Sequence, residues 1–187
     1  SLDRPLDFYG VTDHGTFLGH VEEAATPGTP YYEAPSSIQV NDINSPENLN
    51  TSTIPRRTQA FGGFLINTIT AFSENKLDIK YADSVSRRAW LDTVEAAQRH
   101  NDPGNFTTFI AYEYTASTPN MGNLHRNVIF KGNTNRIPSI PYSRANSNDP
   151  EGLWKWMDRI REDGIESMAI PHNSNGSDGF MFALKDS

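Results

Sequence analysis

The chain has 187 residues, a formal net charge of −7 and no cysteine, and these values exclude several classes of site. Without cysteine there is no disulfide, thiolate zinc site or cysteine nucleophile, so a bound metal has to be held by His, Asp and Glu. The acidic balance and the scattered basic residues argue against a nucleic-acid partner. No apolar run approaches the roughly 20 residues that a membrane span needs.

The two ends of the chain predict a fragment of a larger protein. The chain begins at Ser1 without a methionine, and it stops soon after a sequence motif. Neither composition nor patterning selects a cellular compartment or an oligomeric state, so both stay open.

The N-terminal part combines one predicted strand with a long insertion. Residues 5–12 (P-L-D-F-Y-G-V-T) are apolar on both faces, as in a buried parallel strand. Residues 22–58 are rich in Pro, Ser, Thr and Asn, which predicts an irregular excursion. The apolar residues 58–72 are ambiguous, because two glycines weaken a helix there. We therefore expect an insertion over 22–80 within one domain that spans 1–187.

Helices and strands alternate over the rest of the chain, which is typical of an α/β sheet or barrel. Ser84 or Ser86 can cap the first helix, and Asp149 with Pro150 marks the start of the second. The expected elements are a helix at 84–99, strands at 106–115 and 125–131, a helix at about 149–162 and a strand at 166–171.

Metal-capable side chains stand at the ends of these strands. His14 follows the first strand, Glu113 lies near the end of the second, and His172 follows the last. In α/β folds the functional groups gather at the carboxyl ends of the strands. His125 begins its strand instead, but a hairpin return from Glu113 would bring it to the same end of the sheet. These four side chains could therefore converge on a divalent ion.

Each candidate also has a structural explanation. A single His after a strand is more often a hydrogen-bonded structural residue, Asp13 could cap the next turn, and Glu113 could pair with an arginine. Arg126 could bind an anion, but strand alternation should point it away from the face of His125, which favours an ion pair. Asn173 could support the site or form a turn.

Other histidines and the tryptophans are interpreted as lying outside the site, although His20, six residues after His14, could instead belong to it. His20 and His100 are interpreted as surface residues, and His100 suits the dipole at a helix C-terminus. The three tryptophans are interpreted as packing residues, namely Trp90, Trp154 and Trp156. Sequence signatures of phosphate loops, zincins and serine hydrolases are absent from the chain.

Four ordered motifs resemble the PHP superfamily, named for the polymerase and histidinol phosphatase domain. The most similar branch is catalogued as a domain of unknown function. The resemblance implies that the chain is part of a distorted (β/α)7 barrel with up to three divalent metals, Zn, Mn or Fe, at its C-terminal rim. The motifs are D-F-Y-G-V-T-D-H-G-T-F-L-G at 7–19, F-I-A-Y-E-Y-T at 109–115, G-N-L-H-R-N-V-I-F at 122–130 and I-P-H-N at 170–173.

The resemblance also implies a role for each residue. His14 would serve one metal, Glu113 would bridge two, and His125 with His172 would complete the second. The implied reaction is hydrolysis of a phosphoester in a small anionic substrate by metal-bound hydroxide. The candidate catalytic residues are Asp13 and Glu113, and the candidate substrate contacts are Arg126 and Asn173.

The sequence departs from the superfamily pattern at both ends. An H-x-H motif is expected upstream of residue 1, and a D-x-H motif is expected beyond Ser187. We therefore expect the isolated chain to bind metal weakly, through Glu113, His125 and His172, and to have little activity. Two alternatives stay open: an inactive binding or structural domain, and a metallohydrolase that cleaves C–N or carboxylic ester bonds.

Overall fold

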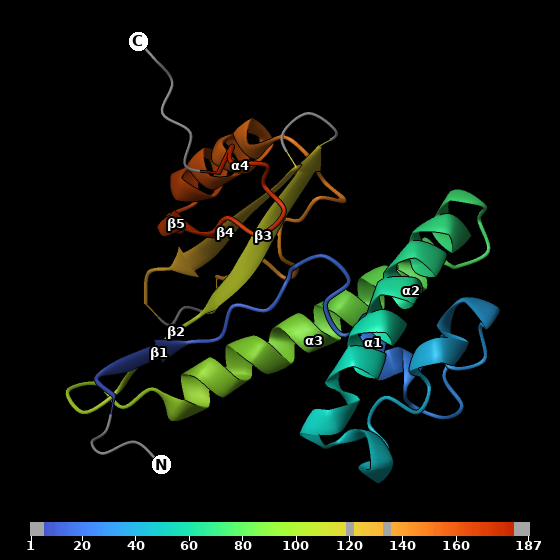
Figure 1. The fold of residues 1–187 in the computed structure, drawn as a ribbon. Coiled ribbons are helices and arrows are strands. Elements are labelled where there is room, and N and C mark those ends of the chain that lie inside the picture. Colours follow the sequence, from blue (N-terminus) through green and yellow to red (C-terminus); the bar gives the residue numbers. More distant parts are fainter. Residues whose placement is uncertain (1–5, 119–121, 133–135, 182–187) are drawn as a thin grey trace. The chain divides into compact units, whose positions relative to one another are not determined.

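The chain folds into two compact units (Figure 1). The computed structural model describes residues 6–118, 122–132 and 136–181. One unit, here called the sheet unit, comprises Ser1–Thr16 and Trp90–Ser187, and the other, the helical unit, comprises Phe17–Ala89. Among the described residues, no helix combines the length and apolarity that crossing a membrane requires.

The sheet unit contains two small sheets. β1 (Phe8–Gly10) and β2 (Thr107–Phe109) pair in parallel, whereas β3 (Ala111–Thr118), β4 (Gly122–Phe130) and β5 (Ser167–Asn173) form an antiparallel sheet in the order β3-β4-β5. The fold is therefore mixed α/β. The predicted strand over 106–115 is divided between β2 and β3.

The described strands do not close into the expected barrel. A (β/α)7 barrel requires parallel neighbours, and parallel neighbours need a crossover connection of about a dozen residues or more. Only residues 119–121 separate β3 from β4, which is too short for a crossover between parallel strands, and the two strands pair as an antiparallel hairpin. The hairpin itself was expected from the sequence, and it is confirmed.

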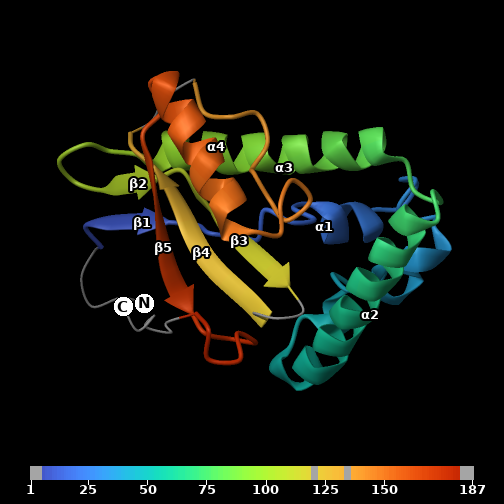
Figure 2. The same ribbon diagram turned by 90° about the horizontal axis from the view of Figure 1, so that it is seen from above.

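One face of the antiparallel sheet carries the core of this unit. Tyr112 and Phe130 point to this face, where they contact Trp90 of α3 (Ile79–His100). Trp156 of α4 (Pro150–Glu162) also contacts Phe130, and α4 lies over this face in both views (Figures 1 and 2). Asp149 caps α4 by accepting a hydrogen bond from the backbone N–H of Glu151, as the sequence predicted.

The opposite face of the sheet carries the polar candidates. Because side chains alternate along a strand, Glu113 and Thr115 of β3 share a face. The β3–β4 register pairs Thr115 with His125, and the β4–β5 register pairs Asn127 with Ile170, two residues before His172. A register irregularity between His125 and Arg126 interrupts the β4–β5 ladder at the end of the sheet where the candidates lie.

The helical unit is built from short helices packed on a longer one. Its elements are α1 (His20–Ala24), the 3₁₀ helices η1 (Pro35–Val40), η2 (Pro46–Asn48) and η3 (Thr51–Thr53), α2 (Ile54–Ser73) and the first part of α3. Tyr31, Val40 and Phe64 are buried at its centre. The excursion predicted over 22–58 thus contains short helical turns, and the ambiguous residues 58–72 lie in α2.

Two expectations about local structure were wrong. The strand predicted at 5–12 is only three residues long, and it is not buried, since Phe8 is 64% exposed. The helix predicted from residue 84 begins five residues earlier, at Ile79. There, the Asp78 carboxylate accepts a hydrogen bond from the backbone N–H of Lys80.

Candidate metal centre

Backbone hydrogen bonds place His14 beside Glu113. The N–H of Glu113 donates to the carbonyl of Asp13 at 2.8 Å, and the N–H of Gly15 donates to the carbonyl of Glu113 at 2.8 Å. This short parallel bridge pairs His14 directly with Glu113. A side chain at Gly15 would come within 2.9 Å of the Tyr112 ring, so glycine allows the segment to approach β3 this closely.

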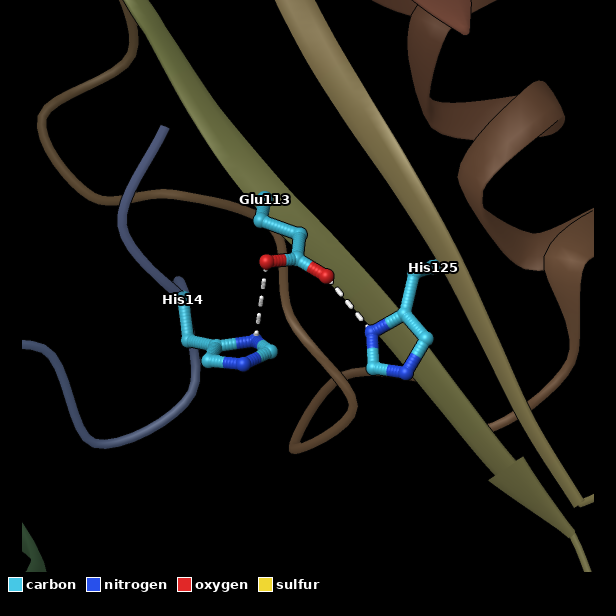
Figure 3. Close-up of side chains that lie close together, drawn as sticks. All are labelled: His14, Glu113 and His125. Atoms are coloured by element: carbon cyan, nitrogen blue, oxygen red, sulfur yellow. Dashed lines mark hydrogen bonds and ion pairs between the residues drawn. The ribbon is translucent and has the colours of Figure 1, made fainter. Parts of the chain in front are cut away.

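Three side chains from separate segments converge on one point (Figure 3). His14 Nδ1 lies 3.5 Å from one Glu113 carboxylate oxygen, Oε2, and His125 Nδ1 lies 2.5 Å from the other, Oε1. One ligand atom from each of the three residues lies within 4.8 Å of the other two. Glu113 and His125 are buried, whereas the His14 side chain is half exposed. These three residues could hold a metal ion.

A third imidazole approaches the same carboxylate. His172 comes from β5, and its Nε2 lies 3.3 Å from Glu113 Oε1. Its ring centroid is 6.3 Å from that of His125. Glu113 is therefore faced by His14 at one oxygen and by His125 and His172 at the other.

Both ring nitrogens of His125 face polar oxygens. Nε2 lies 3.0 Å from the carbonyl oxygen of Asn175, while Nδ1 faces the Glu113 carboxylate. Both oxygens are hydrogen-bond acceptors, and a neutral imidazole has only one N–H. A ring that donates from Nε2 to the Asn175 carbonyl leaves its Nδ1 lone pair to face the Thr115 hydroxyl or a metal ion. Metal-binding histidines usually donate their other ring N–H to such an oxygen.

Thr115 is a member of the cluster that the sequence interpretation missed. Its Oγ1 lies 3.1 Å from His14 Nδ1, 3.0 Å from His125 Nδ1 and 3.3 Å from Glu113 Oε1. A hydroxyl has one proton to donate and two lone pairs, so it can connect several members of the cluster. The i, i+2 spacing from Glu113 was the signal that could have found it.

Asn127 is a second polar residue that was missed. It lies directly opposite Glu113 in the β3–β4 register, and its buried Oδ1 has no hydrogen-bond partner among the described residues. It shares a face with His125, two positions earlier in β4.

The loop after His172 is held against the start of β4. The N–H of Asn123 donates to the carbonyl of Gly176 at 2.8 Å, which brings the Asn175 carbonyl to His125. Gly122 has a φ of 58°, and a Cβ at this position would lie 2.2 Å from the Gly176 oxygen. A glycine is therefore required where this loop crosses the strand.

The remaining candidates lie outside the cluster. The exposed Asp13 contributes its backbone carbonyl to the bridge, and its side chain is not a member of the metal-capable group. Arg126 lies on the opposite face, as alternation predicted, and its guanidinium lies over the Trp154 ring at 5.1 Å, whereas the expected ion pair is not formed with any described residue. Asn173 accepts a hydrogen bond from the N–H of Asn175 and so forms a turn.

The interpretation of His20 as a surface residue was wrong. His20 is buried in the helical unit, where its Nε2 lies 3.0 Å from Ser86 Oγ. Burial lowers its pKa from 6.5 to about 4, and this effect outweighs a backbone hydrogen bond and the nearby Glu23 carboxylate. His100 lies in the last turn of α3, as expected.

Comparison with known protein families assigns the chain to one of them. A family model described as "Protein of unknown function (DUF3604)" matches residues 1–187. The chain belongs to the DUF3604 family. Neither a curated protein nor a solved structure is similar enough to match it. The expectation of a branch with unknown function is thus confirmed, whereas the description of DUF3604 does not connect the family to the PHP superfamily.

The donor set of this DUF3604 chain is suited to a borderline or hard divalent ion. Imidazole nitrogen suits Zn and Fe, whereas a carboxylate adds charge and an oxygen ligand of the kind that also suits Mn. Without cysteine in the chain, the thiolate chemistry that selects soft metals is excluded.

Proposed function

We propose that this chain carries the metal centre of a metal-dependent hydrolase of the PHP type, which cleaves a phosphoester in a small anionic substrate. One observation carries the proposal: both oxygens of the buried Glu113 carboxylate face imidazole nitrogens from three other segments. A carboxylate placed in this way is suited to bridging two divalent ions. His14 would bind one ion, and His125 with His172 would bind the other.

The chain's own residues fix these donors in place. His125 is oriented by the Asn175 carbonyl, Glu113 is held by the backbone bridge to residues 13–15, and Thr115 connects the two histidines next to the carboxylate. A divalent ion held there would lower the pKa of a bound water toward neutrality and would polarise the substrate oxygen. The ligand side chains lie at strand ends, so a closed barrel is not needed to bring them together.

The preference for a phosphoester rests on the PHP resemblance. Arg126 is engaged with Trp154 on the other face of the sheet, so it supplies no nearby cation for a phosphate. Charge on an anionic substrate would be balanced by the ions. Asp13, which is exposed beside His14, is proposed to act on the water or the leaving group, and Asn173 is proposed to contact the substrate.

Metal binding is the first test of this function. Isothermal titration of the EDTA-treated chain with Zn²⁺ and Mn²⁺ should give saturable binding that is lost in Glu113→Gln. The variant keeps the shape of the side chain but removes its charge. His100→Ala is the matched control, because this histidine is not a member of the cluster. Equal affinity in the wild type and Glu113→Gln would contradict the proposal.

Hydrolysis is the second test, and it uses the complete gene product. Metal-dependent cleavage of p-nitrophenyl phosphate or bis-p-nitrophenyl phosphate, abolished by His14→Ala and by Glu113→Gln, is the expected result. Cleavage of p-nitrophenyl acetate alone would assign the centre to carboxylic esters. Metal binding without any hydrolysis of these three substrates would favour the inactive binding domain.

A further inference from the structure

The helical unit contains a pocket that uses none of the residues of the metal centre. It has a volume of about 470 Å³, which lies within the range of small-molecule sites. Four apolar side chains and two polar ones line it, namely Val21, Ile43, Ile54, Phe61, Arg57 and Thr58.

The helix α2 supplies most of the pocket through a single stripe of side chains. Ile54, Arg57, Thr58 and Phe61 are spaced at i, i+3, i+4 and i+7, so they lie on one face of the helix. Ile54 is 54% exposed and Phe61 is 40% exposed, although both are large and apolar. Val21 and Ile43 provide the inner wall, where they join the buried core of this unit.

Among the described residues that line this pocket, Arg57 is the one cation, and no described carboxylate pairs with it. Its Nε is buried without a hydrogen-bond partner, and it forms no ion pair with any described residue. The neighbouring Arg56 differs, because it donates to Asp42 at 2.6 Å and to Asn48 at 2.7 Å. The Thr58 hydroxyl donates to the Ile54 carbonyl and has no negative charge to offer. A guanidinium held beside apolar walls favours a ligand that brings its own anion.

We infer that this pocket binds a small anionic amphiphile, a single carboxylate or phosphate monoester on one hydrocarbon tail. The head group would pair with Arg57, and the tail would cover Ile54 and Phe61. Burial of the tail supplies affinity in proportion to the apolar area removed from water, and the charge selects the anion over a neutral analogue.

Three probes of equal tail length test the inference on the wild-type chain. Isothermal titration of the EDTA-treated protein with decanoate, decyl phosphate and 1-decanol separates the head group from the tail. Decanoate or decyl phosphate should bind at least about tenfold more tightly than decanol, because a charge-assisted hydrogen bond contributes that much or more. Equal binding of decanol, or no saturable binding of either anion, would overturn the inference.

Matched variants on the same helix locate the site. Arg57→Gln should remove the preference for the anions, whereas Arg56→Gln should keep it. Phe61→Ser should weaken all three probes, and Ile66→Ser, which replaces a residue that is 67% exposed and outside the pocket, should weaken none. An unchanged anion preference in Arg57→Gln would refute the assignment. If Arg57→Gln does not fold, the comparison of the three probes on the wild-type chain still tests the inference.

A further experiment tests whether the ligand of this pocket is a free amphiphile or the surface of a lipid bilayer. Cosedimentation with phosphatidylglycerol vesicles should show no dependence on Arg57 if the ligand is a soluble single-tailed molecule. Binding to the vesicles that needs Arg57, together with no binding of decanoate, would overturn the inference in favour of a membrane surface.

Discussion

Two buried histidines, one in each unit, have opposite electrostatic surroundings. His125 is 4% exposed and faces a carboxylate, a hydroxyl and a backbone carbonyl, whereas His20 is 3% exposed and lies among the rings of Phe17, Tyr31 and Phe72. Both ring nitrogens of His125 face polar oxygens. Burial among aromatic rings disfavours a charged His20 and lowers its pKa. Equal burial therefore does not make the two histidines equivalent, because the partners of their ring nitrogens differ.

The largest expected effect is the loss of metal binding when His125 is replaced. His125→Ala removes a donor from a group of three and should lower the affinity for Zn²⁺ by more than about 100-fold, since ligand loss exceeds the effect of a supporting residue. His20→Ala should leave this affinity unchanged. Titration of both variants measures the difference, and equal losses would remove the distinction between the two histidines.

The next largest effect is a pH dependence of stability that arises from His20. Its folded pKa is about 4 and its unfolded value is 6.5, so the unfolded state takes up the proton first as the pH falls. The contribution of His20 to the free energy of unfolding has its full value above pH 6.5. It falls between pH 6.5 and 4 and is constant at lower pH, with a total change of about 3 kcal/mol. Amide hydrogen exchange of α2 at several pH values measures it.

The control for this pH dependence is His20→Phe. The variant keeps an aromatic ring among its aromatic neighbours but cannot titrate, so the decline between pH 6.5 and 4 should flatten. His100→Phe, at the end of α3, should keep the decline. A decline of the same size in His20→Phe would assign it to other groups.

A smaller effect is expected at Thr115. Thr115→Val preserves the β-branched shape and removes the hydroxyl that contacts His14, His125 and Glu113. Because supporting residues typically contribute about 10- to 100-fold to metal affinity, a loss near the lower end of that range is expected. Thr115→Ser should restore most of it. A loss that serine does not rescue would point to the methyl group and to packing.

The smallest effect is expected at Asn173. Its side chain accepts one hydrogen bond within the loop that carries the Asn175 carbonyl. Asn173→Ala should change metal affinity by no more than about threefold, because the loop is also held by the Asn123–Gly176 hydrogen bond. A complete loss of metal binding in this variant would show that Asn173 is a ligand or holds one.

Local signals in the sequence were sufficient for part of the fold. Asp149 and Pro150 marked the start of α4, and the short connection from Glu113 to His125 marked the β3–β4 hairpin. These features depend on neighbouring residues, so a sequence pattern contains them. Alternation of helices and strands left an open sheet and a barrel as alternatives, and the resemblance selected the barrel, although the expected hairpin already favoured antiparallel pairing.

The missed features depend on residues that are far apart in the chain. His20 is buried because Ser86 and the aromatic rings of distant segments surround it, and nothing near position 20 indicates this. The contact of His125 with Asn175 is made by a backbone carbonyl, which no side-chain motif reveals.

Thr115, by contrast, could have been predicted from the alternation of side chains along a strand, because it lies two residues after Glu113.

Anomalous diffraction from crystals of the chain soaked in Zn²⁺ or Mn²⁺ tests the central claim most directly. We expect an anomalous peak within coordination distance of Glu113, His14 and His125, with His172 near the same carboxylate. A metal-saturated crystal with no peak at Glu113, or with its ordered ions held by other residues, would contradict it.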